Sequence, residues 1–313
     1  MSFTIETYDR NYLPGMTALY NAETAYNGHI APLDPERFIR LVEKKQAFDP
    51  NGLFVAVENG AVVGWVHACL AAGSEGGHDP EKRVPRIRML IFPRDRLRVG
   101  GALVAEATAW LKKSGQREFE ALHARYGYPF YRGLWAGGEP MGPVTMPHVQ
   151  MALETNGYKN TQESIFMVAE MDALPPERKA DVPLELTESP AEMRHEPMRE
   201  SWTGFEPRVT RARLEGEDVG GISWVVIPYV AERLGAPCMN IWGLGVKEAH
   251  RRKGIAAALI SQAMRRSYAE GARSCSVGTQ LWNAPAHATY ATMGFYPHTI
   301  VVGRSLLLEE EAK

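Results

Sequence analysis

Three consecutive cations, Arg251, Arg252 and Lys253, precede Gly254 and a run of small and apolar residues typical of a helix. A helix start leaves backbone N–H groups unpaired and carries partial positive charge, so cations are unfavourable there and anions favoured. A polyanionic ligand explains the placement, because Gly254 and Ala256 let phosphate oxygens reach the N–H groups. Taken alone, these six residues also fit a solvated basic turn. They match neither the Walker A loop nor the dinucleotide G-x-G-x-x-G fingerprint.

Regular elements must hold this turn in place. The segment MNIWGLGV, residues 239–246, predicts a strand that ends directly before it. The following helix has Ile255, Ala258, Leu259 and Ala263 on one face, with Gly271 as a natural stop. A further strand is expected at 273–282, followed by a helix that closes with TYATMGFY at 289–296. The turn is therefore expected between a strand and a helix packed on a sheet.

The same order of elements occurs earlier in the chain. Two strand-like runs surround Asn59-Gly60, the strongest two-residue hairpin signal, and a similar hairpin is expected around residues 215–218. A Val-Gly pair follows each turn, at 63–64 and 219–220. The first copy continues with a strand at 86–93, an Arg-rich turn, a helix that stops near Gly115, and a helix within MALETNGY at 151–158. The sequence therefore predicts a degenerate internal duplication.

The two copies differ in one long segment. The first contains RYGYPFYRGLWAGGEPMGPVTMPH, residues 125–148, which is rich in Gly, Pro and aromatic residues and predicts a long ordered loop. Residues 172–183, DALPPERKADVP, have the prolines and alternating charges of an exposed linker. We therefore expect an N-terminal domain at 1–171, a linker at 172–183 and a C-terminal domain at 184–313, each a mixed α/β layer.

The segments around the basic turn resemble the GNAT superfamily of acyl-CoA-dependent N-acyltransferases. Motif A of that family, a strand followed by Q/R-x-x-G-x-G/A, is matched by Arg251, Gly254 and Ala256. The closing motif N-x-x-A-x-x-x-Y-x-x-x-G-F is matched without gaps by Asn283, Ala286, Tyr290, Gly294 and Phe295. The resemblance covers residues 210–305 well and, through the weaker first copy, the whole chain. It implies an α/β (α+β mixed sheet) fold of two tandem GNAT-like domains, of which the N-terminal one is degenerate.

The resemblance also implies where acetyl-CoA binds. In the family, the coenzyme A pyrophosphate lies on the motif A turn, which here comprises Arg251, Arg252, Lys253, Gly254, Ile255 and Ala256. The pantetheine arm lies like an added strand along the preceding strand, here at Leu244, Gly245 and Val246. Strands 239–246 and 273–282 would splay apart to admit it. Gly243 and Gly245 suit a bulge or a close backbone approach, or are ordinary strand glycines. Asn283 would hold the cofactor or the loop after the second strand.

Transfer of an acyl group from a thioester to an amine needs a neutral amine, a stabilised oxyanion and a proton for the thiolate. By analogy with the family, a backbone N–H near Leu244 would serve the oxyanion and Tyr290 would protonate the sulfur. The usual tyrosine pKa of about 10 keeps that hydroxyl protonated at neutral pH, although Tyr290 can also simply pack beneath the nucleotide.

The general base is not evident from the sequence. The family often uses a carboxylate on the motif A strand, and CMNIWGLGV has none. Glu232, Glu206 and Asp218 are substitutes with little to separate them, and His287 is expected at the surface. An acceptor amine of low pKa would need no base.

The first copy departs from both motifs. Its turn reads Arg96-x-x-Val99-x-Gly101, with valine in place of the first motif glycine, while Met146 and Leu153 stand where the asparagine and tyrosine belong. We therefore expect the N-terminal domain to support the structure or to shape the acceptor pocket. Its aromatic residues are expected either to reach a shared cleft or to pack internally; they are Tyr126, Tyr128, Phe130, Tyr131 and Trp135.

Bulk composition excludes several function classes. Lys and Arg total 35 against 37 acidic residues, which gives no basic field for nucleic acid. The three cysteines are widely spaced and the nine histidines lack ligand spacing, so we expect no metal and a reducing compartment. No segment is expected to span a membrane, and the N-terminal residues do not resemble a signal peptide. We expect a cytoplasmic protein, as a monomer or homodimer.

These observations predict an acetyl-CoA-dependent N-acetyltransferase that acts on the primary amine of a small molecule. One alternative is a non-catalytic acyl-CoA-binding or sensing protein, which the retention of both motifs disfavours. Another is an aminoacyl-transferase of related tandem fold, which would need a basic surface for tRNA that this composition does not indicate.

Overall fold

A computed structural model describes residues 2–72, 83–122, 129–137, 142–143, 146–193 and 196–308. The first copy contains β1 (Thr4–Thr7), α1 (Leu13–Thr24), α2 (Pro35–Phe38), β2 (Leu53–Glu58), β3 (Ala61–Ala72), β4 (Arg83–Ile91), α3 (Leu97–Lys112), β5 (Glu118–Ala121), β6 (Gly142–Pro143), α4 (Pro147–Thr155) and β7 (Lys159–Glu170). The second contains β8 (Glu185–Pro190), α5 (Glu196–Ser201), β9 (Arg208–Leu214), β10 (Glu217–Ile227), α6 (Ala231–Leu234), β11 (Cys238–Val246), α7 (Ile255–Ala269), β12 (Ser274–Gln280), α8 (Ala284–Thr292) and β13 (Tyr296–Leu307). The order of the main strands and helices is the same in both copies, which confirms the predicted duplication.

Local sequence explains the two hairpins. The turn residues Asn59-Gly60 and Glu215-Gly216 all have positive φ, at 51°, 77°, 52° and 84°. Two consecutive residues with positive φ define the turn type whose twist matches that of paired strands. The second turn thus occupies two residues of the expected 215–218 range, and it aligns β9 with β10 as the first aligns β2 with β3.

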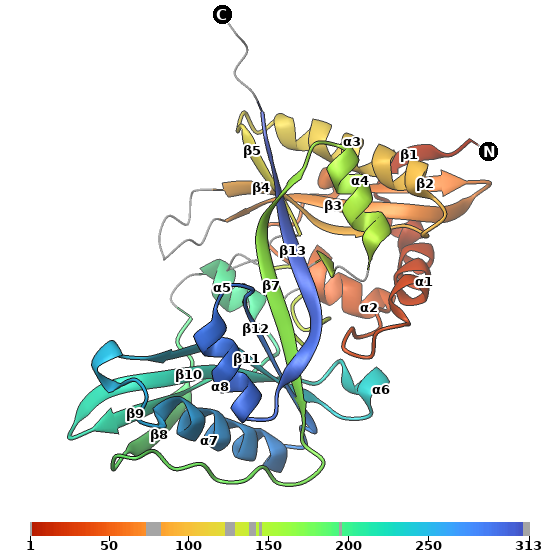
Figure 1. The fold of residues 1–313 in the computed structure, drawn as a ribbon. Helices are drawn as coiled ribbons and strands as arrows, with labels where there is room; N and C mark the ends of the chain where they lie inside the picture. The colour runs from red at the N-terminus through yellow and green to blue at the C-terminus, as the bar shows by residue number, and fades with distance from the viewer. Residues whose placement is uncertain are drawn as a thin grey trace, which may run out of the picture.

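The last strand of each copy lies in the sheet of the other copy. The strands form one 13-stranded sheet within the described residues, in which β13 lies between β5 and β7, and β7 pairs with β12. Thus β13, from the second copy, is the strand that follows β5 of the first copy in the sheet, and β7, from the first copy, is the strand that precedes β12 of the second. Figure 1 shows these two long strands side by side where they join the two halves of the molecule. The sheet is therefore continuous, and the sequence did not predict this exchange.

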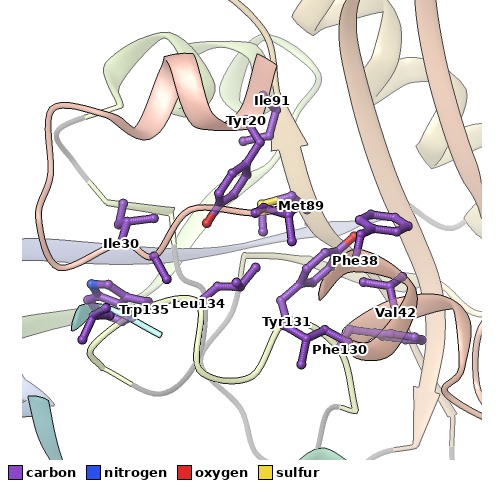
Figure 2. Packing of buried hydrophobic residues seen from close by; sticks show 14 of the residues in the cluster. Tyr20, Ile30, Phe38, Val42, Met89, Ile91, Phe130, Tyr131, Leu134 and Trp135 are labelled. Atoms are coloured by element: carbon purple, nitrogen blue, oxygen red, sulfur yellow. The ribbon is translucent and has the colours of Figure 1, made fainter. Parts of the chain in front are cut away.

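Most of the predicted long loop that the structure describes is buried rather than exposed to a cleft. Phe130, Tyr131, Leu134 and Trp135 belong to a hydrophobic cluster with residues of α1, α2 and β4 (Figure 2). The Tyr131 hydroxyl also lies 2.8 Å from Nδ1 of the buried His67. These aromatic residues therefore have the packing role, while Tyr126 and Tyr128 lie outside the described residues.

Two histidines with rings tilted by 59° lie in contact where β13 meets the N-terminal copy. The His29 and His298 rings are 4.3 Å apart, and Nε2 of His29 is buried without a partner among the described residues. Burial lowers the pKa of His29 to about 4, and the nearby His298 acts in the same direction. Burial also lowers the pKa of His298.

Acid is therefore expected to destabilise the protein through His29. Because its pKa is lower in the folded state, the unfolded state takes up the proton first as the pH falls below about 6.5. Its contribution to stability is present above pH 6.5 and is lost as the pH falls towards 4. One such group adds about 1.4 kcal/mol per pH unit to the slope of the unfolding free energy. Urea unfolding of wild type and His29→Gln between pH 7 and 4 measures this slope, and equal slopes would contradict the assignment.

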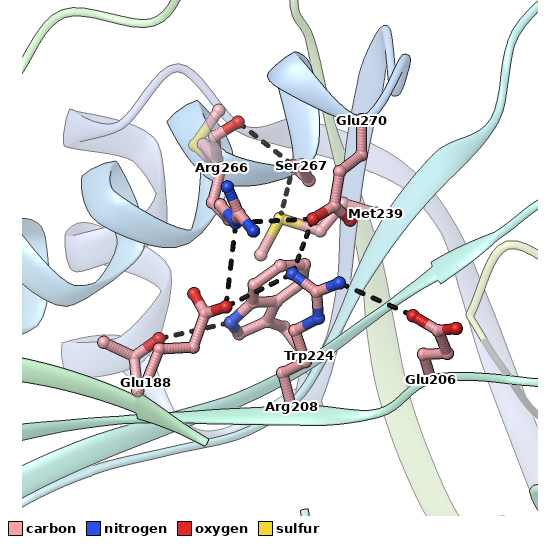
Figure 3. A network of polar contacts seen from close by, with 10 residues as sticks. Glu188, Glu206, Arg208, Trp224, Met239, Arg266, Ser267 and Glu270 are labelled. Carbon is pink, nitrogen blue, oxygen red and sulfur yellow. Dashed lines mark hydrogen bonds and ion pairs between the residues drawn. The ribbon is translucent and has the colours of Figure 1, made fainter. Parts of the chain in front are cut away.

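A network of charged side chains joins β8, β9 and α7 (Figure 3). The Arg208 guanidinium lies 2.5 Å from Glu270, 3.2 Å from Glu188 and 3.5 Å from Glu206, and 5.3 Å from the ring centroid of the buried Trp224. Arg266 of α7 also lies 3.7 Å from Glu188 and 3.4 Å from Glu270. Loss of Arg208 therefore leaves Glu188 and Glu270 sharing the single charge of Arg266, and it removes the cation beside Glu206.

We expect Arg208→Met to lower the free energy of unfolding by about 1–2 kcal/mol. Arg213→Met is the matched control, since Arg213 forms a single half-exposed pair with Asp218 at 2.6 Å and such pairs contribute little. Denaturant melts at low and high salt measure both. Equal effects of the two substitutions would show that the network adds nothing beyond an isolated surface pair.

Candidate active site

The strands β11 and β12 separate part-way along their length, as predicted. They pair in parallel from Cys238 with Ser274 to Ile241 with Val277, and no pairing continues beyond that point. The Lys247 N–H donates to Val219 O of β10, so strand alternation turns the backbone groups of Leu244 and Val246 away from β10. These groups therefore face the gap between β11 and β12, where an extended ligand can pair with them.

A β-bulge lies at the mouth of this gap. The pairing of β10 with β11 shifts between Ser223 and Trp224, which leaves Trp242 as the extra residue. The sequence suggested Gly243 and Gly245 as residues that suit a bulge or a close backbone approach, and the bulge falls at Trp242, directly before Gly243. A Cβ built on Gly245 would meet no atom within 4 Å. Gly245 therefore borders open space in the cavity, which a side chain at this position would occupy.

The basic turn has a backbone conformation suited to anions. Arg252 and Gly254 have positive φ, at 60° and 72°, and Gly254 is the N-cap of α7. Within the described residues, no backbone acceptor is found for the N–H groups of residues 252–256. Successive N–H groups in such a turn form a concave site for anions such as phosphate.

A single cavity of about 810 Å³ joins the turn to the gap between the strands. Every residue predicted for the site lines it except Lys253. The carbonyl of Lys253 accepts a hydrogen bond from the Asp181 N–H instead. Arg251 lies on the wall and donates through Nε to Val246 O at 3.2 Å. The strand backbone, the basic turn and Tyr290 therefore share one site.

Tyr290 lies on the cavity wall and is contributed by α8. Its ring is 5% exposed and packs 5.5 Å from the ring of Phe295. Burial raises the pKa of Tyr290 to about 12, and the neighbouring Cys275 thiol acts in the same direction. Its hydroxyl therefore stays protonated over the physiological pH range and can donate a proton or a hydrogen bond.

Asn283 fixes the start of α8 beside the cavity. Its side chain accepts from the Ala286 N–H at 3.4 Å and donates to Thr279 Oγ1 at 3.3 Å. The side chain of Asn283 is therefore engaged in holding the loop between β12 and α8, which is one of the two roles expected for it.

None of the proposed substitutes for the general base lines the cavity. Glu232 pairs with Arg37, Glu206 lies 3.5 Å from Arg208, and Asp218 lies 2.6 Å from Arg213. His287 also lies outside the wall and contacts Gln280 O through Nε2 at 3.1 Å. The three carboxylates are thus engaged by arginines away from the reacting centre.

Sequence reasoning did not single out two wall residues, Trp242 and His250. Nδ1 of His250 is buried with no partner in the described part of the chain. The position of His250, directly before the basic turn, was the available signal. Trp242 had no comparable signal, because a bulge depends on the pairing of β10 with β11.

The first copy has no comparable turn. Arg96 pairs with Glu58 at 2.8 Å, and its carbonyl accepts from the N–H groups of Val99 and Gly100. The ring of Phe92 packs so closely on Gly100 that a Cβ there would lie 2.3 Å from it. At the start of α3 the N–H groups of Val99 and Gly100 are therefore already paired, unlike those of residues 252–256.

Within the described residues, no helix combines the length and hydropathy of a membrane span. The same residues contain no cluster of three or more side chains suited to hold a metal ion.

Residues 176–295 match the model of the acetyltransferase (GNAT) family. This segment is a GNAT domain. It contains the basic turn, the gap between β11 and β12, and Tyr290. A search of curated protein sequences returned no match.

Solved structures extend the GNAT similarity to the whole fold. A GCN5-related N-acetyltransferase from Sphaerobacter thermophilus superposes with a TM-score of 0.65 and 14% identity, covering 99% of this chain and 97% of that one. A tandem GNAT protein from the clavulanic acid biosynthesis pathway gives 0.64 and 15%, covering 99% and 100%. A glucosamine N-acetyltransferase region of a fungal GH3 β-N-acetylglucosaminidase gives 0.67 and 13%, covering 97% and 38%. At these identities the comparisons establish the tandem GNAT fold.

Proposed function

We propose that this protein is an acetyl-CoA-dependent N-acetyltransferase that acetylates a primary amine of a small molecule. The observation that carries the proposal is the cavity in which the part of β11 that has no partner in β12, the basic turn and Tyr290 meet. The turn suits the diphosphate of the cofactor, and Leu244 and Val246 suit the amide groups of its pantetheine arm.

In this scheme the acceptor amine attacks the thioester carbonyl. A backbone N–H of β11 near Leu244 stabilises the oxyanion, and Tyr290 donates a proton to the departing thiolate. The amine proton leaves to water or to a base that the described residues do not identify, so an amine with a lowered pKa is the favoured acceptor.

Residues of the N-terminal copy lie behind the cavity wall, next to residues that pack on Trp242. Arg132 lies 4.1 Å above the ring of Trp202 and donates to Ser201 Oγ at 2.8 Å. Trp202 in turn packs 5.7 Å from Trp242 on the cavity wall. We therefore assign the N-terminal copy a supporting role in shaping the acceptor pocket, with no cofactor of its own.

Two measurements test this function. Isothermal titration with acetyl-CoA shows whether the cofactor binds, and release of free coenzyme A thiol over a panel of amines shows whether an acetyl group is transferred. Amino sugars belong in the panel because one structural neighbour is named as a glucosamine N-acetyltransferase region. Binding with thiol release supports the enzyme. Binding without release on any amine would favour a sensing protein, and no binding would reject both.

A further inference from the structure

The linker between the two copies runs against the helix that begins at the cofactor site. It leaves β7 in the middle of the sheet and must reach β8 at the edge. On the way, residues 175–181 lie along α7, as four hydrogen bonds show. Asp181 N–H donates to Lys253 O at 3.0 Å, Arg178 N–H donates to Ser261 Oγ at 3.0 Å, Ser261 Oγ donates to Pro176 O at 2.9 Å, and Arg265 donates to Pro175 O at 2.6 Å.

The linker also touches the turn directly. A Cβ built on Gly254 would lie 3.1 Å from Ala180 Cα and 3.3 Å from Lys179 O. Gly254 therefore has the linker on one side and the cavity on the other. The residues 172–183 are mostly exposed, as predicted for a linker, yet their backbone is fixed to α7 at these points.

The bond to Lys253 determines how one peptide plane is oriented. The carbonyl of Lys253 and the N–H of Gly254 belong to the same trans peptide, so they point in opposite directions. Since the carbonyl points to Asp181, the Gly254 N–H points away from the linker, on the side where Gly254 borders the cavity.

We propose that the linker residues 175–181 are a positioning element that holds the motif A turn ready for the cofactor diphosphate. This inference rests on the proposed use of acyl-CoA. A turn that is already held in its binding conformation binds the diphosphate more tightly, because binding then does not have to supply the free energy needed to order the loop. The linker acts only through the turn, so its effect is specific to ligands that carry the diphosphate.

Ser261 offers a way to loosen the linker without touching the cavity. It is 1% exposed, forms two of the four bonds and does not line the cavity. Alanine is a good helix former, so Ser261→Ala should leave α7 folded. The double variant Ser261→Ala, Arg265→Met removes a third bond and keeps the aliphatic stem. Gln262→Ala, an exposed position next to Ser261, is the matched control.

The test compares the Kd of coenzyme A with that of pantetheine, which lacks the diphosphate. We expect the Kd of coenzyme A to rise about threefold in Ser261→Ala and about tenfold in the double variant. The Kd of pantetheine should not change, and Gln262→Ala should affect neither ligand. An unchanged Kd for coenzyme A in the double variant, or equal losses for both ligands, would overturn the inference. Failure of the wild-type protein to bind coenzyme A would instead reject the proposed function.

Discussion

Ala256→Glu is expected to weaken coenzyme A binding by about a hundredfold or more, because it places a carboxylate where the diphosphate binds. Ala256 lines the cavity and is the second residue of α7. An acidic side chain is favourable in the first turn of a helix, so the free protein should be as stable as wild type or slightly more stable. Isothermal titration and a thermal melt of the same preparation measure both effects.

The duplication supplies a matched control for this substitution. Gly101 occupies the equivalent place in the first copy, and a Cβ there would meet only Asn156 Nδ2, at 3.8 Å. Gly101→Glu should therefore fold and bind coenzyme A with wild-type affinity. Retained binding in Ala256→Glu would remove the diphosphate from the motif A turn. A loss in Gly101→Glu would place a cofactor in the first copy.

Tyr290→Phe should reduce turnover by about a hundredfold while changing the Kd of acetyl-CoA by less than about twofold. The substitution removes one oxygen and retains the ring that packs on Phe295. The measurement is thiol release at saturating acetyl-CoA, together with isothermal titration. Because the pKa of Tyr290 is raised to about 12, the wild-type rate should not fall between pH 9 and 10 through loss of this proton.

Tyr296→Phe is the control for removal of a tyrosine hydroxyl from the same region of the chain. Tyr296 is exposed and its hydroxyl lies 3.1 Å from Glu170, away from the cavity wall. Its loss should leave both turnover and cofactor affinity unchanged. A wild-type rate in Tyr290→Phe would reduce Tyr290 to a packing residue, and the thiolate would then take its proton from water.

Features encoded by short stretches of sequence were predicted well. The Asn59-Gly60 hairpin follows from residues that tolerate positive φ, and α7 follows from a 3.6-residue apolar period between Gly254 and Gly271. The residues of the cavity were predicted through the family resemblance, because motif A and the closing motif are short uninterrupted stretches that could be matched residue by residue.

Features that depend on contacts between distant segments were not predicted. Both β7 and β13 are long strands that follow a helix and a glycine. Their hydrophobic patterns do not determine which strands they pair with in the sheet. The bulge at Trp242 depends on pairing with β10 in the same way. The orientation of the Lys253 peptide depends on Asp181, in a linker that the sequence presents only as exposed.

The place of β13 beside β5 has a consequence for synthesis on the ribosome. Translation releases β5 long before β13, so the emerging first half has an open strand edge for as long as the second half is being made. Such edges invite aggregation, and domains that complete themselves early avoid this exposure. Native closure of the N-terminal half therefore has to wait until β13 has been synthesised and has left the ribosome.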